Sequence, residues 1–397
     1  MARSAPYSHS LGPQQTRPPP KVGSGPLKAC SMQSVAARPE TVKPASSAST
    51  VAADGFGEAA SGFEAASWKQ LLAEAVRDAG ELCRLLGLPD DLAREAKAAQ
   101  GDFPLLVPRG FVARMRPGDA GDPLLRQVLP VAAEVKPQPG YSPDPLAEQG
   151  RLTAAGLVQK YSGRALLLAA AGCAVNCRYC FRRSFPYSDS GVHRAGLAEA
   201  VAAIAADASL EEVILSGGDP LLLDDDRLGE LVGQLDAIPH LTRLRLHTRL
   251  PIVLPERVTG RLVEVLADSR LTAVVVVHAN HAAELDASVA AAMQRLAAGG
   301  TMLFNQAVLL AGVNDSAEAL AALSRRLLDC RVTPYYLHLL DRVEGAAHFA
   351  VEEPQAVALH EALKRRLPGY AVPRLVREIP GEPSKTWIGL DRLASFA

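Results

Sequence analysis

Three of the six cysteines in this 397-residue chain, Cys173, Cys177 and Cys180, lie within eight residues, in the sequence GCAVNCRYCFRR. Thiolates with this spacing can converge on one metal centre if the segment forms a loop. A zinc site usually needs four ligands, and His193 is a fourth candidate at an unusual spacing. A [4Fe–4S] cluster normally takes four thiolates, so three would leave one iron open to another ligand. The polar residues between the cysteines argue against three merely buried thiols. We therefore expect a metal centre and favour the cluster.

Two further segments contain residues suited to chemistry. The sequence SGGDP at residues 216–220 follows a short apolar run. Its glycines would let the backbone approach a ligand closely, although Gly-Gly alone usually marks only a turn. Near the end of the chain, REIPGEPSKTW contains Lys385. A lone lysine is most often a solvated surface group, but a desolvated amine can act as a nucleophile.

The elements that must position these residues follow from the pattern of apolar runs after residue 164. The runs are ALLLAAAG, EEVILSGG, LTRLRLHT, LTAVVVVH, TMLFNQAVLL and VTPYYLHLL. Helical patterns near 195–207, 224–236, 256–268, 284–298, 315–329 and 352–366 lie between or after them. Six strand–helix units predict a parallel sheet with helical crossovers, short of the eight units of a closed barrel. We expect an α/β fold: a partial (β/α)6 TIM-like barrel with a helical N-terminal subdomain.

In such a barrel, functional residues gather at the carboxyl ends of the strands. Residues suited to chemistry lie within the last part of each predicted run or just after it: Cys173, Gly217 to Asp219, His247 to Arg249, His278 to His281, Gln306 and His338 to Asp341. The apolar runs predict the strands without reference to these residues. Their position therefore supports the predicted topology.

The regions that flank the predicted barrel differ in composition. Residues 1–66 are rich in Ser, Ala, Pro and Gly without a sustained apolar period, which predicts a disordered low-complexity extension. Apolar residues from Trp68 to Leu86 recur at helical spacing, which predicts one helix that Pro89 ends. We expect a helical subdomain and connector over 67–150, the core over 151–370 and a C-terminal segment with Lys385 over 371–397.

The composition limits the classes of function. A formal net charge of −1 argues against a protein that binds nucleic acid or a membrane surface by bulk electrostatics. No apolar run reaches the ~18 residues of a membrane span. Six scattered cysteines do not form a disulfide framework. We expect a soluble protein of a reducing compartment, the cytoplasm.

The CxxxCxxC sequence after the first core strand resembles the signature of radical S-adenosylmethionine (SAM) enzymes. Residues 141–388 also resemble the lysine 2,3-aminomutase family within that group. The resemblance is carried, in order, by DPLAEQG, KYSGRALLL, CAVNCRYCFRR, SGGDPL, LPIVLPERVT, HANHAAEL, NQAVLLAGVND and YYLHLLD. Several pieces in one order are more specific than any single motif. The resemblance implies three cofactors: a [4Fe–4S] cluster on Cys173, Cys177 and Cys180, SAM, and pyridoxal 5′-phosphate (PLP).

The resemblance also implies roles for the other candidates. Lys385 takes the place of the lysine that binds PLP covalently. The residues implied to hold the PLP phosphate are Lys160, Tyr161 and Arg164, with Lys160 where the family often has Arg. Those implied to contact SAM are Gly217, Gly218, Asp219, His278 and Gln306, with Asp219 where the family often has Glu.

The substrate contacts are implied in the same way. Arg182 corresponds to the arginine that binds the α-carboxylate of lysine, which suits a guanidinium fork. Asp341 and Glu378 correspond to the acids that bind its ε-ammonium, and Glu378 stands where the family usually has Asp. The implied reaction moves the α-amino group of L-lysine to C3, as an isomerase of the intramolecular aminotransferase type.

One branch of the family is especially similar. The sequences LCRLLGL, VPRGFVARM, DPLLRQVLP and REIPGEPSKT resemble bacterial enzymes that make (R)-β-lysine from (S)-lysine for elongation factor P. The end of the chain twelve residues after Lys385 fits this branch, because full aminomutases continue further. The implied partners are L-lysine, elongation factor P with its lysyl-ligase, and an electron donor such as flavodoxin. A homodimer is allowed.

Three alternatives remain open from the sequence. The first is a metabolic lysine 2,3-aminomutase that makes free β-lysine. The second is a zinc-binding module without catalysis, and the third is a radical SAM enzyme without PLP. Whether the substrate is free or protein-bound lysine also stays open.

Overall fold

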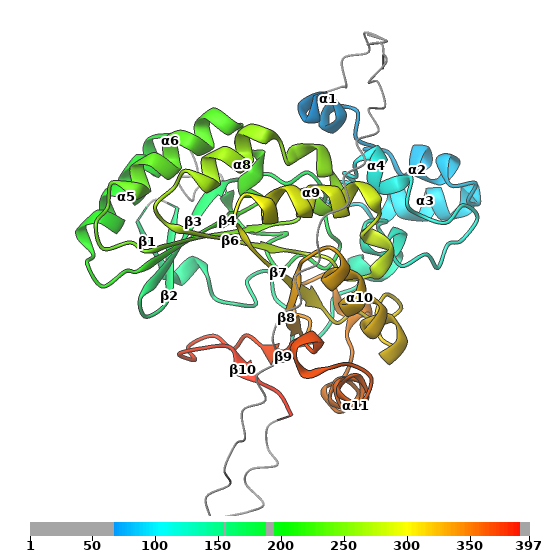
Figure 1. Ribbon diagram of the computed structural model, residues 1–397. Coiled ribbons are helices and arrows are strands. Elements are labelled where there is room, and N and C mark those ends of the chain that lie inside the picture. The colour runs from blue at the N-terminus through cyan, green and yellow to red at the C-terminus, as the bar shows by residue number, and fades with distance from the viewer. Residues whose placement is uncertain (1–66, 155, 188–193, 390–397) are drawn as a thin grey trace, which may run out of the picture. The chain divides into compact units, whose positions relative to one another are not determined.

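The computed structural model describes residues 67–154, 156–187 and 194–389, and every structural statement below concerns these residues (Figure 1). They belong to one compact unit, Phe63–Ala397. The extension expected over residues 1–66 and the alternative ligand His193 both lie outside the described residues.

A ten-stranded mixed sheet forms the centre of this unit, and its strand order follows the chain from β1 to β10. Neighbouring strands from β3 to β9 are parallel, whereas β1, β2 and β10 add antiparallel pairs at the two edges. The strands are β1 Leu152–Ala154, β2 Leu157–Tyr161, β3 Arg164–Ala170, β4 Glu212–Gly217, β5 Arg243–Thr248, β6 Thr272–Val277, β7 Met302–Val308, β8 Thr333–His338, β9 Arg374–Arg377 and β10 Thr386–Trp387.

Helices connect the parallel strands as the alternating pattern predicted. They are α5 Arg194–Ala206, α6 Asp225–Asp236, α7 Leu250–Val253, α8 Gly260–Ala267, α9 Ala287–Ala298, α10 Ala317–Asp329 and α11 Glu353–Lys364. Asp224, Thr259, Asp286 and Ser316 each cap a helix, since their side chains accept a backbone N–H from three residues further on. In Figure 1, α5, α6, α8 and α9 cover the same side of the sheet.

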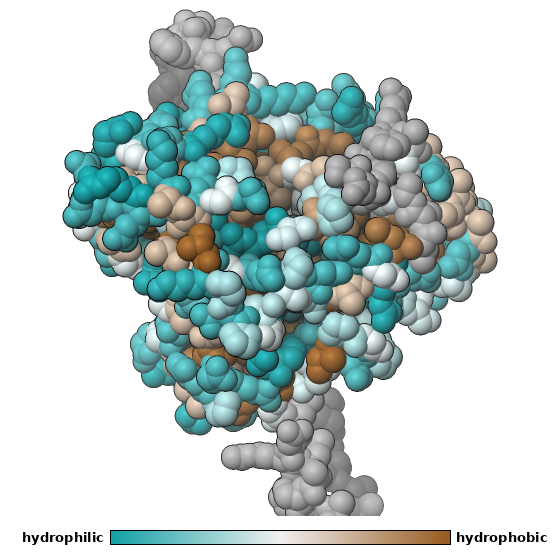
Figure 2. Space-filling view, turned by 180° about the vertical axis from the view of Figure 1, so that it is seen from behind, coloured by the Kyte–Doolittle hydropathy of each residue, from teal (hydrophilic) through white to brown (hydrophobic). Residues whose placement is uncertain are grey.

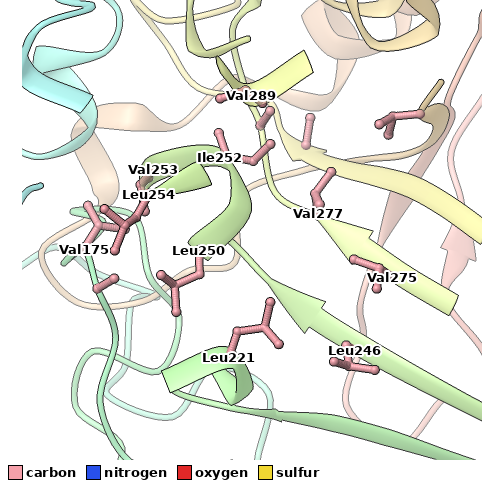
Figure 3. Close-up of a cluster of buried hydrophobic side chains, with 14 of the residues drawn as sticks. Val175, Leu221, Leu246, Leu250, Ile252, Val253, Leu254, Val275, Val277 and Val289 are labelled. Carbon is pink, nitrogen blue, oxygen red and sulfur yellow. The ribbon is translucent and has the colours of Figure 1, made fainter. Parts of the chain in front are cut away.

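The main hydrophobic core lies between the sheet and these helices. Figure 3 shows Leu246 of β5 and Val275 and Val277 of β6 near side chains of α7 and near Val289 of α9. Strand β6 has the sequence TAVVVV, a nearly continuous apolar run. Such runs are typical of parallel strands that are covered on both faces. The alternation of strands and helices from β3 to α11 confirms the partial (β/α)6 barrel, and the helices over residues 68–112 form the expected helical N-terminal subdomain.

The single helix predicted from Trp68 to Leu86 is wrong. The structure has two helices there, α1 Trp68–Ala73 and α2 Ala79–Leu85. Between them, Val76 pairs with Val107 in an antiparallel bridge, with N···O distances of 2.8 and 3.0 Å. The Asp78 side chain then caps α2 by accepting the amide of Glu81. A tertiary backbone pair and a capping residue therefore override a continuous helical period.

The rest of the N-terminal subdomain consists of short elements. They are α3 Asp90–Ala99, α4 Arg109–Val112 and the 3₁₀ helices η1 Leu125–Gln127 and η2 Ala132–Val135.

Hydrophilic side chains cover most of the face shown in Figure 2, and hydrophobic ones gather in small patches. None of the helices in the described parts of the chain has the length and apolar character that a membrane crossing requires.

The C-terminal segment extends the sheet beyond the six predicted units. Strand β9 pairs in parallel with β8, and β10 folds back antiparallel onto β9. The turn between β9 and β10 includes Glu378 and Lys385. The segment around Lys385 is therefore held against the last strands of the barrel, which brings the lysine to the same end of the sheet as the cysteines.

Candidate active site

A cavity of about 500 Å³ lies at the carboxyl ends of the strands, within the usual size range of small-molecule sites. The structure brings every candidate residue of the described chain into its lining. These residues are Lys160, Tyr161, Arg164, Cys173, Cys177, Cys180, Arg182, Gly217, Gly218, Asp219, His278, Gln306, Asp341, Glu378 and Lys385. They come from segments as far apart in the sequence as β2 and the β9–β10 turn. Only the tertiary structure brings them together.

The cysteines occupy the loop after β3, and the N-terminal subdomain holds this loop in place. Arg178, between the second and third cysteines, is completely buried and donates from Nε to Glu134 Oε1 at 2.9 Å. Its backbone amide donates to the carbonyl oxygen of Gln127 at 2.9 Å. The amide of Asn176 donates to the carbonyl oxygen of Leu106 at 3.0 Å. The loop thus has a defined conformation fixed from outside the barrel.

The donor chemistry of the loop fits an iron–sulfur cluster. Burial raises the pKa of Cys173, and burial followed by Cys177 raises the pKa of Cys180 to about 11. Thiols in this setting ionise when they bind a cationic centre. Among the described residues, no three His, Cys, Asp or Glu side chains are grouped around one point as a single metal ion requires. A [4Fe–4S] cluster differs, because each thiolate binds a different iron atom of the cluster.

The two glycines of SGGDP lie where the end of β4 meets the cysteine loop. Gly217 has a φ of 113°, which side chains rarely tolerate. The amide of Gly218 donates to the carbonyl oxygen of Ala170 at 2.7 Å. The glycines therefore allow two backbone segments to approach each other, in addition to their place in the cavity wall.

Asp219 lines the cavity, but its carboxylate is satisfied by the protein. Thr248 Oγ1 donates to Oδ1 at 2.6 Å, and the amide of Arg249 donates to Oδ2 at 2.7 Å. The amides of Leu221 and Leu250 complete the set at 3.1 and 3.0 Å. Asp219 therefore joins the ends of β4 and β5, which shapes the region where contact with SAM was expected.

A continuous chain of ion pairs crosses the cavity wall. It runs from Arg182 to Glu148, then to Lys160, Glu378 and Lys385. The Lys160 Nζ atom lies 2.7 Å from Glu148 Oε1 and 2.8 Å from Glu378 Oε1. Lys385 Nζ donates to the second oxygen of Glu378. Despite burial, Lys385 and then Lys160 hold the pKa of Glu378 well below its ordinary value. Four of these five residues were candidates, and Glu148 was missed.

Asp341 lies near this chain without joining it. The lysines of the chain contact Glu148 and Glu378 rather than the Asp341 carboxylate. Burial, followed by the charge of Glu378, raises the pKa of Asp341 to about 7. A cation placed beside Asp341 would favour its charged form. Of the two acids expected to bind an ammonium group, Glu378 forms ion pairs with Lys160 and Lys385, whereas these lysines act on Asp341 only by partly opposing the rise of its pKa.

Next to Lys160, Tyr161 and Arg164 close one side of the cavity. The Arg164 guanidinium lies 4.6 Å from the centre of the Tyr161 ring. Burial, followed by Glu378, raises the pKa of Tyr161 well above its ordinary value. The tyrosine thus remains a neutral hydroxyl beside charged neighbours, a set of groups suited to phosphate oxygens.

Three histidines from separate strand ends face the same space. His278 Nε2 lies 2.8 Å from Gln306 Nε2, and burial lowers the pKa of His278 to about 3. The Nε2 atoms of His247 and His338 are buried and have no hydrogen-bond partner among the described residues. An unpaired buried polar atom is costly, so both imidazoles fit a site that receives a polar ligand.

Arg249 is another residue at this end of the sheet that was not assigned a role. Its Nη1 atom contacts Cys177 Sγ, and its Nη2 atom donates to Gln127 Oε1 at 2.7 Å and to Glu284 Oε2 at 3.0 Å. The sequence placed Arg249 directly after the third predicted strand. Its partners could not be identified from spacing, because Gln127 comes from the N-terminal subdomain.

The model of the Radical SAM superfamily matches residues 168–283. L-lysine 2,3-aminomutase of Escherichia coli (strain K12) is 49% identical over 324 residues, which cover 81% of this chain and 94% of the relative. The chain belongs to the L-lysine 2,3-aminomutase family. A relative of that name from Haemophilus influenzae is 45% identical over 81% of this chain and 96% of its own. A third, from Clostridium subterminale, is 31% identical over 80% of this chain and 77% of its own.

A solved radical SAM methyltransferase from Sphaerobacter thermophilus aligns over 56% of this chain and 68% of its own, with 18% identity and a TM-score of 0.39. This likeness is too distant to support an argument. Membership of the aminomutase family confirms the expected family and its isomerase class. It implies a [4Fe–4S] cluster, SAM and PLP as cofactors. The thiols, the ion-pair chain and the unpaired imidazoles are compatible with these groups.

Proposed function

We propose that this chain is a radical SAM, PLP-dependent lysine 2,3-aminomutase that converts (S)-α-lysine to (R)-β-lysine. The observation that carries the proposal is the convergence of the three cysteines with Lys385, Arg182 and the acidic residues in one cavity. Identity of 49% to the E. coli relative supports the same substrate class. We place the enzyme in a reducing compartment, the cytoplasm.

When bound, the cluster with SAM supplies a carbon radical for hydrogen abstraction, and PLP supplies a carbonyl that binds an amine. The chain's own residues do the positioning. Cys173, Cys177 and Cys180 would hold the cluster on the loop after β3. Lys385 would hold PLP, and its amine must lose a proton before it can react. The adjacent Glu378 carboxylate holds that amine in place, because Lys385 Nζ donates to it.

The PLP phosphate would lie near Lys160, Tyr161 and Arg164, which provide two cations and a hydroxyl. The α-carboxylate of the substrate would lie near Arg182. Its ε-ammonium would lie near Asp341, with Glu378 as the second acid. Residues at the ends of β4, β6 and β7, namely Gly217, Gly218, Asp219, His278 and Gln306, would surround SAM.

We further propose that the product serves elongation factor P. The support is the resemblance of the N-terminal helices and of the REIPGEPSKT segment to the enzymes of that branch. The identities of 49% and 45% to the E. coli and H. influenzae relatives, against 31% to the Clostridium relative, agree with it. An elongation factor P lysyl-ligase and a flavodoxin-type electron donor would then be functional partners. A metabolic aminomutase that makes free β-lysine is the alternative.

The test is anaerobic incubation of the reconstituted enzyme with SAM, PLP, dithionite and L-lysine, followed by chiral analysis of the product. We expect (R)-β-lysine. No β-lysine from an enzyme with a full cluster and intact SAM cleavage would overturn the aminomutase proposal. If no brown cluster with ~400 nm absorbance forms on reconstitution, the radical mechanism itself would be excluded.

A second experiment addresses the destination of the product. The purified product would be supplied with ATP to an elongation factor P lysyl-ligase and unmodified elongation factor P. Mass spectrometry would follow the modification. Preferred attachment of this product over α-lysine supports the proposed role. Equal or no attachment favours the metabolic alternative.

A further inference from the structure

Glu148 lies between two cations of the site that belong to different segments. Its Oε1 atom is 2.7 Å from Lys160 Nζ and 2.9 Å from Arg182 Nη2. Its Oε2 atom is 2.6 Å from Arg182 Nε. The side chain is 2% exposed. Burial opposes its ionisation, but Arg182 and then Lys160 hold the pKa of Glu148 below its ordinary value. One buried carboxylate thus binds both cations.

The backbone before Glu148 has an unfavourable conformation. Ala147 has a φ of 49°, in the left-handed region that a residue with a Cβ atom seldom adopts. The Asp144 side chain stabilises the turn, because it accepts the amides of Glu148 and Gln149 at 3.0 and 3.2 Å. Strain of this kind persists where surrounding contacts enforce it, often near functional sites. Here it accompanies a glutamate that lines the cavity.

Glu148 also limits how Arg182 can bind a ligand. Two guanidinium nitrogens, Nε and Nη2, face Glu148. The third, Nη1, donates to Ser216 Oγ at 3.0 Å and to the carbonyl oxygen of Gly217 at 3.3 Å. These four contacts hold the guanidinium plane in one orientation and leave one Nη2 hydrogen for an incoming carboxylate. The paired fork expected to bind the substrate is thus occupied by Glu148 in this structure. The guanidinium is therefore oriented before substrate binds.

We propose that Glu148 is a positioning residue, which fixes the separation and orientation of Arg182 and Lys160. In this way it fixes the position of the substrate carboxylate relative to the PLP phosphate. The proposal rests on the proposed function, which assigns these two ligands to the two cations. Loss of the Glu148 charge would leave two adjacent cations without their shared counter-ion. Lys160 would keep Glu378, and Arg182 would keep Ser216 and Gly217, but no group would then hold the two cations relative to each other.

The experiment compares Glu148→Gln and Glu148→Asp with a matched control, Asp225→Asn. Asp225 is paired with buried Arg257, 2.7 Å away, and is not part of the cavity lining. Each variant is reconstituted with its cluster. We would measure PLP affinity by absorbance titration, KM for lysine, 5′-deoxyadenosine released per β-lysine formed, iron content and Tm.

We expect Glu148→Gln to raise the PLP Kd and the lysine KM by about tenfold or more, because a charge-assisted contact is lost. It should also release more 5′-deoxyadenosine per product, with unchanged iron content. Glu148→Asp should recover part of these losses, since it retains the charge. Asp225→Asn should lower Tm and leave both affinities near those of the wild type.

Two outcomes would overturn the proposal. In the first, Glu148→Gln has wild-type PLP affinity and lysine KM. In the second, it only lowers Tm, as Asp225→Asn does. If the wild-type enzyme makes no β-lysine, the proposed function fails instead. In that case the PLP titration of the Glu148 variants still tests the contact with Lys160.

Discussion

A Cβ atom on Gly218 would lie 1.9 Å from the carbonyl oxygen of Gly172, the residue that precedes Cys173. The same carbonyl accepts the amide of Asp219 at 2.7 Å. The glycine turn after β4 and the cysteine loop after β3 are therefore one closely packed backbone unit. The conformation of the loop depends on the absence of a side chain at residue 218.

Gly218→Ala should accordingly disturb the cysteine loop. The clash is with backbone, which cannot move aside as a flexible side chain can, so we expect a lower Tm and reduced iron content after anaerobic reconstitution. Gly233→Ala is the control, because Gly233 lies in helix α6 and an added Cβ would meet no atom within 4 Å. That change should be neutral or stabilise the protein by up to about 1 kcal/mol. Full iron content in Gly218→Ala would contradict this view of the loop.

Cys177→Ala should prevent stable assembly of the cluster, since only two thiolates would remain. Iron and sulfide analysis, together with the visible absorbance of the cluster, would measure the loss. Cys330→Ala is the control. Cys330 is buried in the core, away from the cavity lining, so the iron content of this variant should match the wild type. Normal iron content in Cys177→Ala would show that the cysteine assignment is wrong.

Lys385→Ala should abolish covalent PLP binding and amine migration while SAM cleavage persists, because the cluster loop is separate from the β9–β10 turn. PLP absorbance after gel filtration and 5′-deoxyadenosine release would separate the two effects. Lys364→Ala changes a lysine on α11 that is paired with Glu361 at the surface and should behave like the wild type. Retained mutase activity in Lys385→Ala would refute its assignment.

The pH dependence of substrate binding should follow Asp341. Its raised pKa of about 7 means that the carboxylate becomes charged as pH rises through that value. The charged form attracts an ammonium group, so the lysine KM should fall over that range. Glu378 has a lowered pKa and stays ionised throughout. The other charges that act on Asp341 are Lys385 and Lys160, which lower its pKa, and Glu148, which raises it.

Asp341→Asn is the variant that isolates this effect. It should raise the lysine KM and flatten its pH profile around neutrality, as measured by initial rates at several lysine concentrations. If the profile of the variant still follows that of the wild type, another group is responsible for the titration.

Glu134→Gln should destabilise the protein strongly, because Glu134 is the shared partner of two arginines in the cysteine segment. It contacts Arg178, which is 0% exposed, and Arg183. Breaking a buried ion pair on one side costs on the order of 3 kcal/mol. Glu318→Gln, in an exposed pair with Arg366, should have a much smaller effect on stability. Urea unfolding would measure both, and equal small effects would argue against a supporting role for Glu134.

The local patterns of the sequence predict a large part of this molecule. The spacing of Cys173, Cys177 and Cys180 indicates a metal centre, and alternating apolar runs predict the strand–helix units of the core. Both signals are short-range, because they depend on residues close in sequence and on the periods of helix and strand. The same local reasoning is wrong where distant backbone intervenes, as when Val76 pairs with Val107 and ends α1.

The sequence by itself thus determined the topology and the types of group at the strand ends. Only the tertiary structure decided which groups are partners. Arg182 is held by Glu148, 34 residues away, and Lys160 by Glu378, 218 residues away. The physical reason is that ion pairing depends on distance and burial in space, which no period along the chain records. For this reason the sequence predicted no role for Glu148, although it lies in DPLAEQG, and only the fold made it part of the site.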